Sequence, residues 1–184
     1  VMALGGPLNR FTAVYSATGA INTSDEREKT WRGGLTKQEL SAARRIASEI
    51  GAYQWNDAVA EKGEDGARVH YGVRAQQVAR ILMEEGVEDQ QNVDFAPDIF
   101  LSEATRPSFK SAFLCFDTWD NSFETKVDRT QSSILDADGA PIVVETPRIE
   151  QVQSAGNRFG LRIDQLTMFI IAAQGQRLAA LEAA

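Results

Sequence analysis

The sequence is poor in the residues from which metal sites and disulfides are built. Its 184 residues include a single cysteine, Cys115, and a single histidine, His70. One cysteine cannot form an internal disulfide, and the pair falls short of the ligand set of a structural zinc site. We therefore expect no metal and no other cofactor. Cys115 lies in an apolar run and is interpreted as a small buried core residue.

Long apolar runs and an excess of basic residues are also missing. No apolar stretch approaches the roughly 20 residues that span a bilayer, and the first residues lack a signal-peptide pattern, so no membrane partner is expected. With 19 Lys and Arg against 26 Asp and Glu, the net charge of -7 argues against nucleic acid as a partner. Because the chain begins with Val1 rather than Met, we interpret it as a segment of a longer polypeptide.

The patterns that are present predict an α+β fold. Residues 11–16 and 20–23 alternate as short strands do, and we interpret them as the end of a larger β structure upstream. Thr36 and Glu39 form a capping-box pattern that predicts a helix ending at Gly51. Residues 73–85 predict a second mid-chain helix, ended by Gly86.

Short strands are predicted around these helices. Residues 53–55 and 69–71 read as a hairpin-like pair. Residues 94–149 read as an extended β excursion, with a strand at 111–116 and a hairpin that turns at residues 136–139. The excursion is rich in aromatic residues, so we expect it to pack against another surface.

The C-terminal residues 159–184 are predicted to form a long helix with two apolar seams. Such a helix needs two partners, either its own domain and copies of itself, or two parts of one core. The first seam holds Ile163, Leu166, Ile170 and Ala173, and the second holds Ile171, Leu178 and Leu181.

Ser24 and Lys29 lie in a charged run that follows the expected β end. A lysine amine that is removed from water can activate a serine hydroxyl as a base. Taken alone, a serine and a lysine at this spacing are more typical of a solvated turn between a strand and a helix.

Three blocks, in order, resemble the endosialidase-type intramolecular chaperone domains, the S74 peptidase family at the C-terminus of phage tail spikes and fibres. The first is Ser24-Asp25 with Lys29. The second, residues 70–78, is similar to the family's Gly-hydrophobic-x-Ala-Gln-x-Val motif. The third, residues 170–181, is similar to its C-terminal helix. The resemblance covers residues 15–184, and within it the excursion matches only as a variable insertion.

The resemblance implies an intertwined homotrimer in which residues 1–23 end the upstream fibre and residues 24–184 form a chaperone and autocleavage domain. This domain would help to fold the covalently linked fibre in the host cytoplasm during virion assembly, and the parent fibre would belong to the virion tail. The resemblance also implies a self-cleaving serine endopeptidase that acts once, in cis, between Thr23 and Ser24. Ser24 would be the nucleophile and Lys29 the base.

Two further residues each have two possible roles, one catalytic and one structural. Asp25 could orient Lys29, although capping the next turn is its commoner role. His70 begins the second block, and it could position the scissile carbonyl or relay a proton, or be a strand residue held by packing. Trp31 and Trp55 are interpreted as core or interface aromatics.

Two other functions are compatible with the residues. The domain could be retained as a trimeric cap or receptor-binding tip that uses the aromatic-rich excursion. It could also be a freestanding serine hydrolase, although no Gly-x-Ser-x-Gly elbow surrounds any serine.

Overall fold

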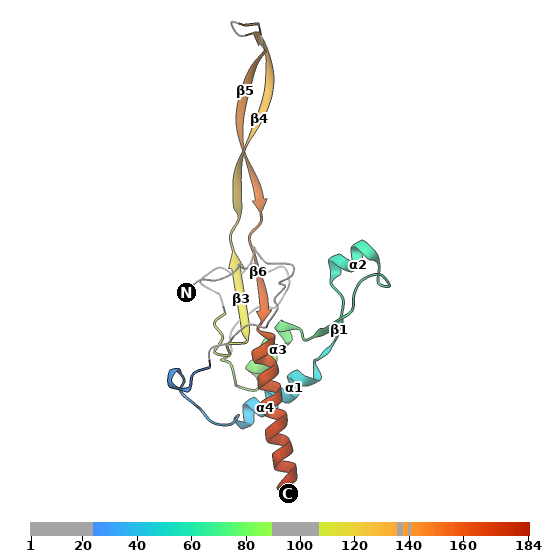
Figure 1. The fold of residues 1–184 in the computed structure, drawn as a ribbon, viewed down its shortest axis with the longest axis vertical. Helices are drawn as coiled ribbons and strands as arrows, with labels where there is room; N and C mark the ends of the chain where they lie inside the picture. The colour runs from blue at the N-terminus through green and yellow to red at the C-terminus, as the bar shows by residue number, and fades with distance from the viewer. Residues whose placement is uncertain (1–23, 90–106, 136–137, 140) are drawn as a thin grey trace. The chain divides into compact units, whose positions relative to one another are not determined.

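The computed structural model describes residues 24–89, 107–135, 138–139 and 141–184 (Figure 1). The predicted strands within residues 11–23 lie outside this part. The described residues fall into two compact units. The first unit contains residues 24–89, 109–115 and 161–184. The second contains residues 107–108 and the described residues between 116 and 160. Four α-helices and small antiparallel sheets make up an α+β fold.

Helix α1, Lys37–Ser48, begins at the predicted capping box. The Glu39 amide donates to Thr36 Oγ1 at 3.2 Å, and the Thr36 amide donates to Glu39 Oε2 at 2.7 Å. The prediction that Gly51 ends this helix is wrong, because Gly51 is the first residue of a strand. The Glu49 amide donates to the Ile46 carbonyl and tightens the last turn, so no left-handed glycine is needed.

Helix α3, Ala75–Glu84, confirms the second predicted helix. Gly86 has φ of +72°, and the Val87 amide donates to the Leu82 carbonyl at 2.9 Å. This is the helix end that glycine favours, because it has no Cβ to clash in the left-handed region.

The hairpin-like pair is confirmed between β1, Gly51–Tyr53, and β2, His70–Gly72, which are antiparallel. The sequence reasoning missed α2, Asn56–Lys62, which lies between the two strands. Its first residue follows Trp55, whose side chain cannot accept a capping hydrogen bond, so the usual start signal is absent. Gln54 Nε2 closes the connection by donating to the carbonyls of Glu64 and Ala67.

The core of the first unit forms where α1 packs against α3 and α4, Ile163–Glu182 (Figure 1). Each large aliphatic side chain buried there contributes roughly 1.5–3 kcal/mol. No helix of the described residues is both long and apolar enough to cross a membrane. The buried side chains are Ala42, Ala43, Ile46, Val78, Ala79, Ile81, Leu82, Met83, Leu166 and Ala173.

The C-terminal helix begins later than predicted, because residues 156–161 form a strand before α4 begins at Ile163. On α4, Leu166 and Ala173 of the first seam are buried, whereas Ile171, Leu178 and Leu181 of the second are more than half exposed. Leu166 and Ala173 pack on the chain's own core, whereas Ile163 of the same seam is 57% exposed, and the second seam has no cover within the described chain.

The second unit is built from hairpin strands. β3, Leu114–Trp119, pairs with β6, Gly156–Leu161. β4, Ser122–Leu135, pairs antiparallel with β5, Pro141–Gln153, which confirms the predicted hairpin. The ion pairs Lys126–Glu150 and Arg148–Asp128 share one face of this ribbon. The other face exposes apolar residues that include Phe123, Val127 and Ile149, and it also carries the Arg129–Glu145 ion pair.

A buried carboxylate in the first unit attaches the segment before β3 to the helical core. Glu88 is 3% exposed, and it accepts hydrogen bonds from the Lys110 amide at 2.8 Å and the Ser111 amide at 2.7 Å. These bonds place Phe113 against Phe169 of α4, with ring centroids 5.4 Å apart. Neither the carboxylate nor its partners were signalled by the sequence pattern.

We predict that Glu88→Ala lowers the free energy of unfolding by about 2–4 kcal/mol, because two buried amides lose a charged acceptor. Asp89→Ala is the matched control, since its exposed ion pair with Lys110 is worth about 1 kcal/mol or less. Denaturant unfolding followed by circular dichroism measures both changes. Equal losses in the two variants would contradict the role given to Glu88.

Candidate active site

Ser24 and Lys29 are brought together by a single turn of 3₁₀-helix. This turn, η1, covers Glu26–Glu28, and the Lys29 amide donates to the Glu26 carbonyl at 3.1 Å. The chain therefore folds back, and Lys29 Nζ donates to Ser24 Oγ at 2.6 Å. Both side chains are exposed to solvent. A lysine can take the serine proton only in its neutral form, and removal from water favours that form.

Asp25 caps η1, and its carboxylate contacts Arg27 rather than Lys29 within the described residues. Its Oδ1 accepts from the Arg27 amide at 3.0 Å, and its carboxylate pairs with the Arg27 guanidinium. The hydrogen bonds from Arg27 hold the pKa of the Asp25 carboxyl below its usual range. Of the two roles considered for Asp25, orienting Lys29 or capping the next turn, the geometry is that of capping. Arg27 is the partner that the sequence did not identify.

The Asp25 carboxyl is expected to titrate below the free-aspartate value of about 3.9. Because its pKa is lowered in the folded chain, its contribution to holding η1 is present above the unfolded pKa and is lost as pH falls through the folded one. Arg27→Ala should raise the pKa towards the free value, whereas Arg32→Ala should leave it unchanged. NMR titration of the Asp25 carboxyl carbon measures this pKa. An unchanged value in Arg27→Ala would contradict this assignment.

His70 lies in an aromatic cluster rather than beside the serine and lysine. It is directly opposite Tyr53 in the β1–β2 pair, and the two rings stack with centroids 5.4 Å apart. The Trp55 ring lies edge-on to the His70 ring, with centroids 6.3 Å apart, and edge-on to the Tyr53 ring, with centroids 5.5 Å apart. In Figure 1, the segment that carries Ser24 and Lys29 lies on one side of α1, and β1 and α2 lie on the other. Within one chain, the structure does not bring His70 to the dyad.

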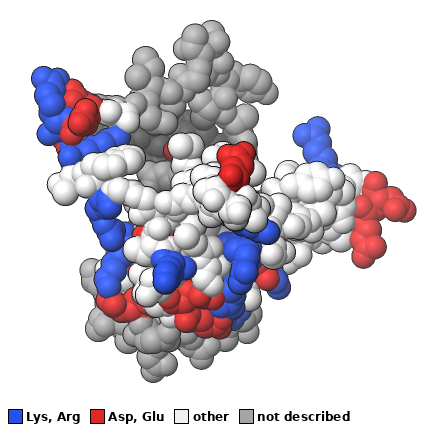
Figure 2. Space-filling view, turned by 90° about the horizontal axis from the view of Figure 1, so that it is seen from below, with Lys and Arg blue, Asp and Glu red and all other residues white. Residues whose placement is uncertain are grey.

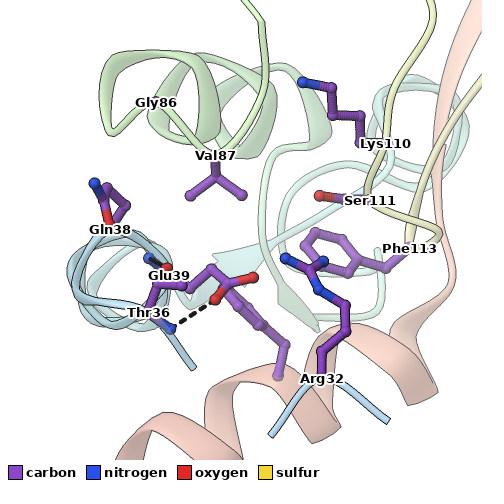
Figure 3. Close-up of a pocket in the computed structure, with 10 residues that line it drawn as sticks. Arg32, Thr36, Gln38, Glu39, Gly86, Val87, Lys110, Ser111 and Phe113 are labelled. Atoms are coloured by element: carbon purple, nitrogen blue, oxygen red, sulfur yellow. Dashed lines mark hydrogen bonds between the residues drawn. The ribbon is translucent and has the colours of Figure 1, made fainter. Parts of the chain in front are cut away.

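A groove of about 490 Å³ in the first unit is separate from these residues (Figure 3). It is lined by Thr36 and Glu39 at the first turn of α1, and by Arg32, Lys110, Ser111 and Phe113. Its carboxylate, Glu39, is engaged in the capping box. Ser24, Asp25, Lys29 and His70 do not line it. A nucleophile that is covalently attached to its target needs no substrate pocket.

One predicted site residue has no geometry here. Thr23, the residue before the predicted scissile bond, lies outside the described residues. Within the described ranges, no group of three or more His, Cys, Asp or Glu side chains is arranged to hold a metal ion.

Residues 24–87 match the family described as chaperone of endosialidase, Peptidase_S74. The match begins at Ser24 and includes the dyad, α1, the β1–β2 pair with α2, and α3.

Relatives with similar sequences are phage tail proteins. The chain is 28% identical over 179 residues to the side tail fiber protein pb1 of Escherichia phage T5, covering 97% of this chain and 11% of that protein. It is 28% identical over 170 residues to a probable tail spike protein of Klebsiella phage 0507-KN2-1, covering 92% of this chain and 12% of the relative. The chain thus spans about a tenth of the length of these relatives.

Two solved structures share the fold. One is the carboxy-terminal domain of the bacteriophage T5 L-shaped tail fibre with its intramolecular chaperone domain, at a TM-score of 0.63 and 27% identity. That match covers 99% of this chain and 36% of the other. The second is a crystal structure of a novel intramolecular chaperone, at a TM-score of 0.50 and 27% identity, covering 85% of this chain and 99% of the other.

Together, the α+β fold, the exposed Ser–Lys pair and these structural neighbours define a domain of the intramolecular-chaperone class. Its residues 24–87 match the model of the chaperone-of-endosialidase family, Peptidase_S74. The family resemblance expected from the sequence is thereby confirmed.

Proposed function

We propose that this domain is a trimeric folding chaperone for a phage tail fibre or spike to which it is covalently linked, and that it releases itself by cutting between Thr23 and Ser24. The observation that carries the cleavage proposal is the 2.6 Å hydrogen bond between Lys29 Nζ and Ser24 Oγ at the first matched residue. The chaperone role is supported by the family and by its fibre-linked structural neighbours. It would act in the host cytoplasm during assembly, with the parent fibre on the virion tail.

The proposed reaction needs only the chain itself and one water molecule. Ser24 Oγ attacks the carbonyl carbon of Thr23, and the hydroxyl proton passes to Lys29 and then to the Ser24 nitrogen as the C–N bond breaks. Water hydrolyses the resulting ester, leaving a carboxylate on Thr23 and a free amine on Ser24. Because Oγ is already next to its target, the enzyme contributes geometry and a base rather than substrate binding.

A chaperone that trimerises first solves a kinetic problem of β-structured fibres. Pairing strands from different chains is slow to nucleate, and unpaired edges aggregate until the register is set. Holding three chain ends together raises their effective concentration, so folding can proceed from a fixed start. Cutting the chaperone away then leaves a fibre whose persistence depends on its unfolding barrier.

We predict that Ser24→Ala and Lys29→Arg keep the chain at full length. Arginine retains the positive charge of Lys29 but cannot accept a proton, so the rate should fall by about 10²–10⁴. Intact mass and N-terminal sequencing should show a fragment that begins with Ser24 only when both residues are present.

The controls are Ser48→Ala and Lys62→Arg, which change a serine and a lysine elsewhere and should leave cleavage as in the natural sequence. If the natural chain forms trimers and stays whole, the cleavage proposal is wrong and the retained cap or receptor-binding tip takes its place. Turnover of an ester or peptide supplied in trans would instead support a freestanding hydrolase.

The second seam of α4 is the surface that we assign to trimer formation. Leu178 is 57% exposed, and Ile171 lies one heptad before it. Leu178→Glu should cost roughly 3 kcal/mol per chain and shift the protein from trimers to monomers in sedimentation experiments. Ala172→Glu, exposed on another side of the helix, is the matched control. Trimers that persist in Leu178→Glu would refute the assignment.

A further inference from the structure

Two surfaces of the first unit are exposed on opposite sides of α1 (Figure 1). The first, called here the dyad loop, consists of residues 24–32. The second, called here the aromatic hairpin, consists of residues 51–72 and includes β1, α2 and β2. A close approach of the two within one chain would require α1 to leave its packing against α3 and α4.

The dyad loop lacks the cover that its chemistry needs. Ser24 and Lys29 are exposed, so water competes for the hydrogen bond between them. Trp31, two residues further on, is 85% exposed. A large aromatic side chain at that exposure, beside an uncovered dyad, indicates a surface that is buried in an assembly.

The aromatic hairpin has complementary properties. Tyr53, Trp55 and His70 share one cluster, and Trp55 is 57% exposed. A pair of three-residue strands is too short to be stable without further packing. Its outer side therefore offers apolar area and one imidazole to a partner. A partner that covers this side excludes water from the contact.

Parts of the two surfaces carry opposite charges, although the whole dyad loop, residues 24–32, balances three basic residues with three carboxylates. Residues 29–32 carry Lys29 and Arg32 and no carboxylate, whereas residues 61–65 at the end of α2 carry three carboxylates and one lysine. Figure 2 shows a group of carboxylates with a Lys or Arg side chain near it at the α2 edge of the viewed face, and Lys and Arg side chains interspersed with carboxylates along the opposite edge. Opposite charges at the rim of an interface favour one orientation of approach over others.

We propose that the active site is completed between chains: the dyad loop of one copy docks on the aromatic hairpin of a second copy, whose Tyr53, Trp55 and His70 exclude water from Ser24 and Lys29. This inference rests on the cleavage proposal. His70 acts as a positioning residue through Lys29, and its neighbours supply the apolar cover. Repeated head to tail, the contact closes a ring with one site per chain. Cleavage is then coupled to assembly, because an isolated chain leaves the dyad in water.

A mixing experiment separates sites within a chain from sites between chains. His70→Ala should slow cleavage at least about tenfold by itself, because the dyad loses part of its cover. Co-expression with Ser24→Ala chains, which are uncuttable but keep an intact hairpin, should restore cutting to about half of the His70→Ala chains in an equal mixture. Chains tagged with different masses identify which one is cut.

The matched control mixes Ser24→Ala with Lys29→Ala chains. Both changes lie in the dyad loop, so no mixed site has an intact dyad and no cutting should appear. Ser48→Ala, on α1 and outside both surfaces, should cut at the natural rate. Normal cutting in His70→Ala, or no rescue in the first mixture, would overturn the proposal while the cleavage assignment stands.

Photo-crosslinking tests the contact without relying on cleavage. A photoreactive amino acid at position 31 of uncuttable Ser24→Ala chains should form adducts with residues 53–71 of another copy. Mixed light and heavy isotopes distinguish adducts between chains from adducts within one, and the same label at position 48 serves as the control. Adducts confined to one chain, or formed elsewhere on the second copy, would refute the contact.

Discussion

The packing of α1 against α3 and α4 is the constraint on which the rest of the first unit depends. The capping box fixes where α1 begins, and therefore where the dyad loop leaves the core. The other end of α1 leads into β1, and the Arg74–Glu49 ion pair ties that end to the start of α3. Because one helix separates the two exposed surfaces, its position sets how far apart they lie within a chain.

This arrangement explains why a single chain exposes so much apolar surface. Monomeric proteins rarely expose extended apolar patches, yet the second seam of α4, the aromatic cluster and one face of the β4–β5 ribbon all do so. A two-stranded ribbon is marginal in water, so its apolar face also requires a partner. In the proposed assembly, copies of the chain and the linked fibre would cover each of these surfaces.

The same logic applies to the chemistry. A serine and a lysine within hydrogen-bond distance are necessary for the proposed reaction, but in water they remain an ordinary polar contact. The environment, rather than the dyad itself, would decide when the bond is cut. A chaperone that is removed by cleavage benefits from this dependence, because premature cutting would release the fibre before its register is set.

The sequence by itself determined the features that are local or repeat with a fixed period. These include the capping box at Thr36, the glycine end of α3 at Gly86, the β4–β5 hairpin, and the spacing that lets Lys29 reach Ser24. It missed α2 and β6, which carry no capping or alternation signal, and it could not show that Glu88 is buried or that His70 is separated from the dyad. Those features depend on residues far apart in the chain, and only tertiary packing decides which of them meet.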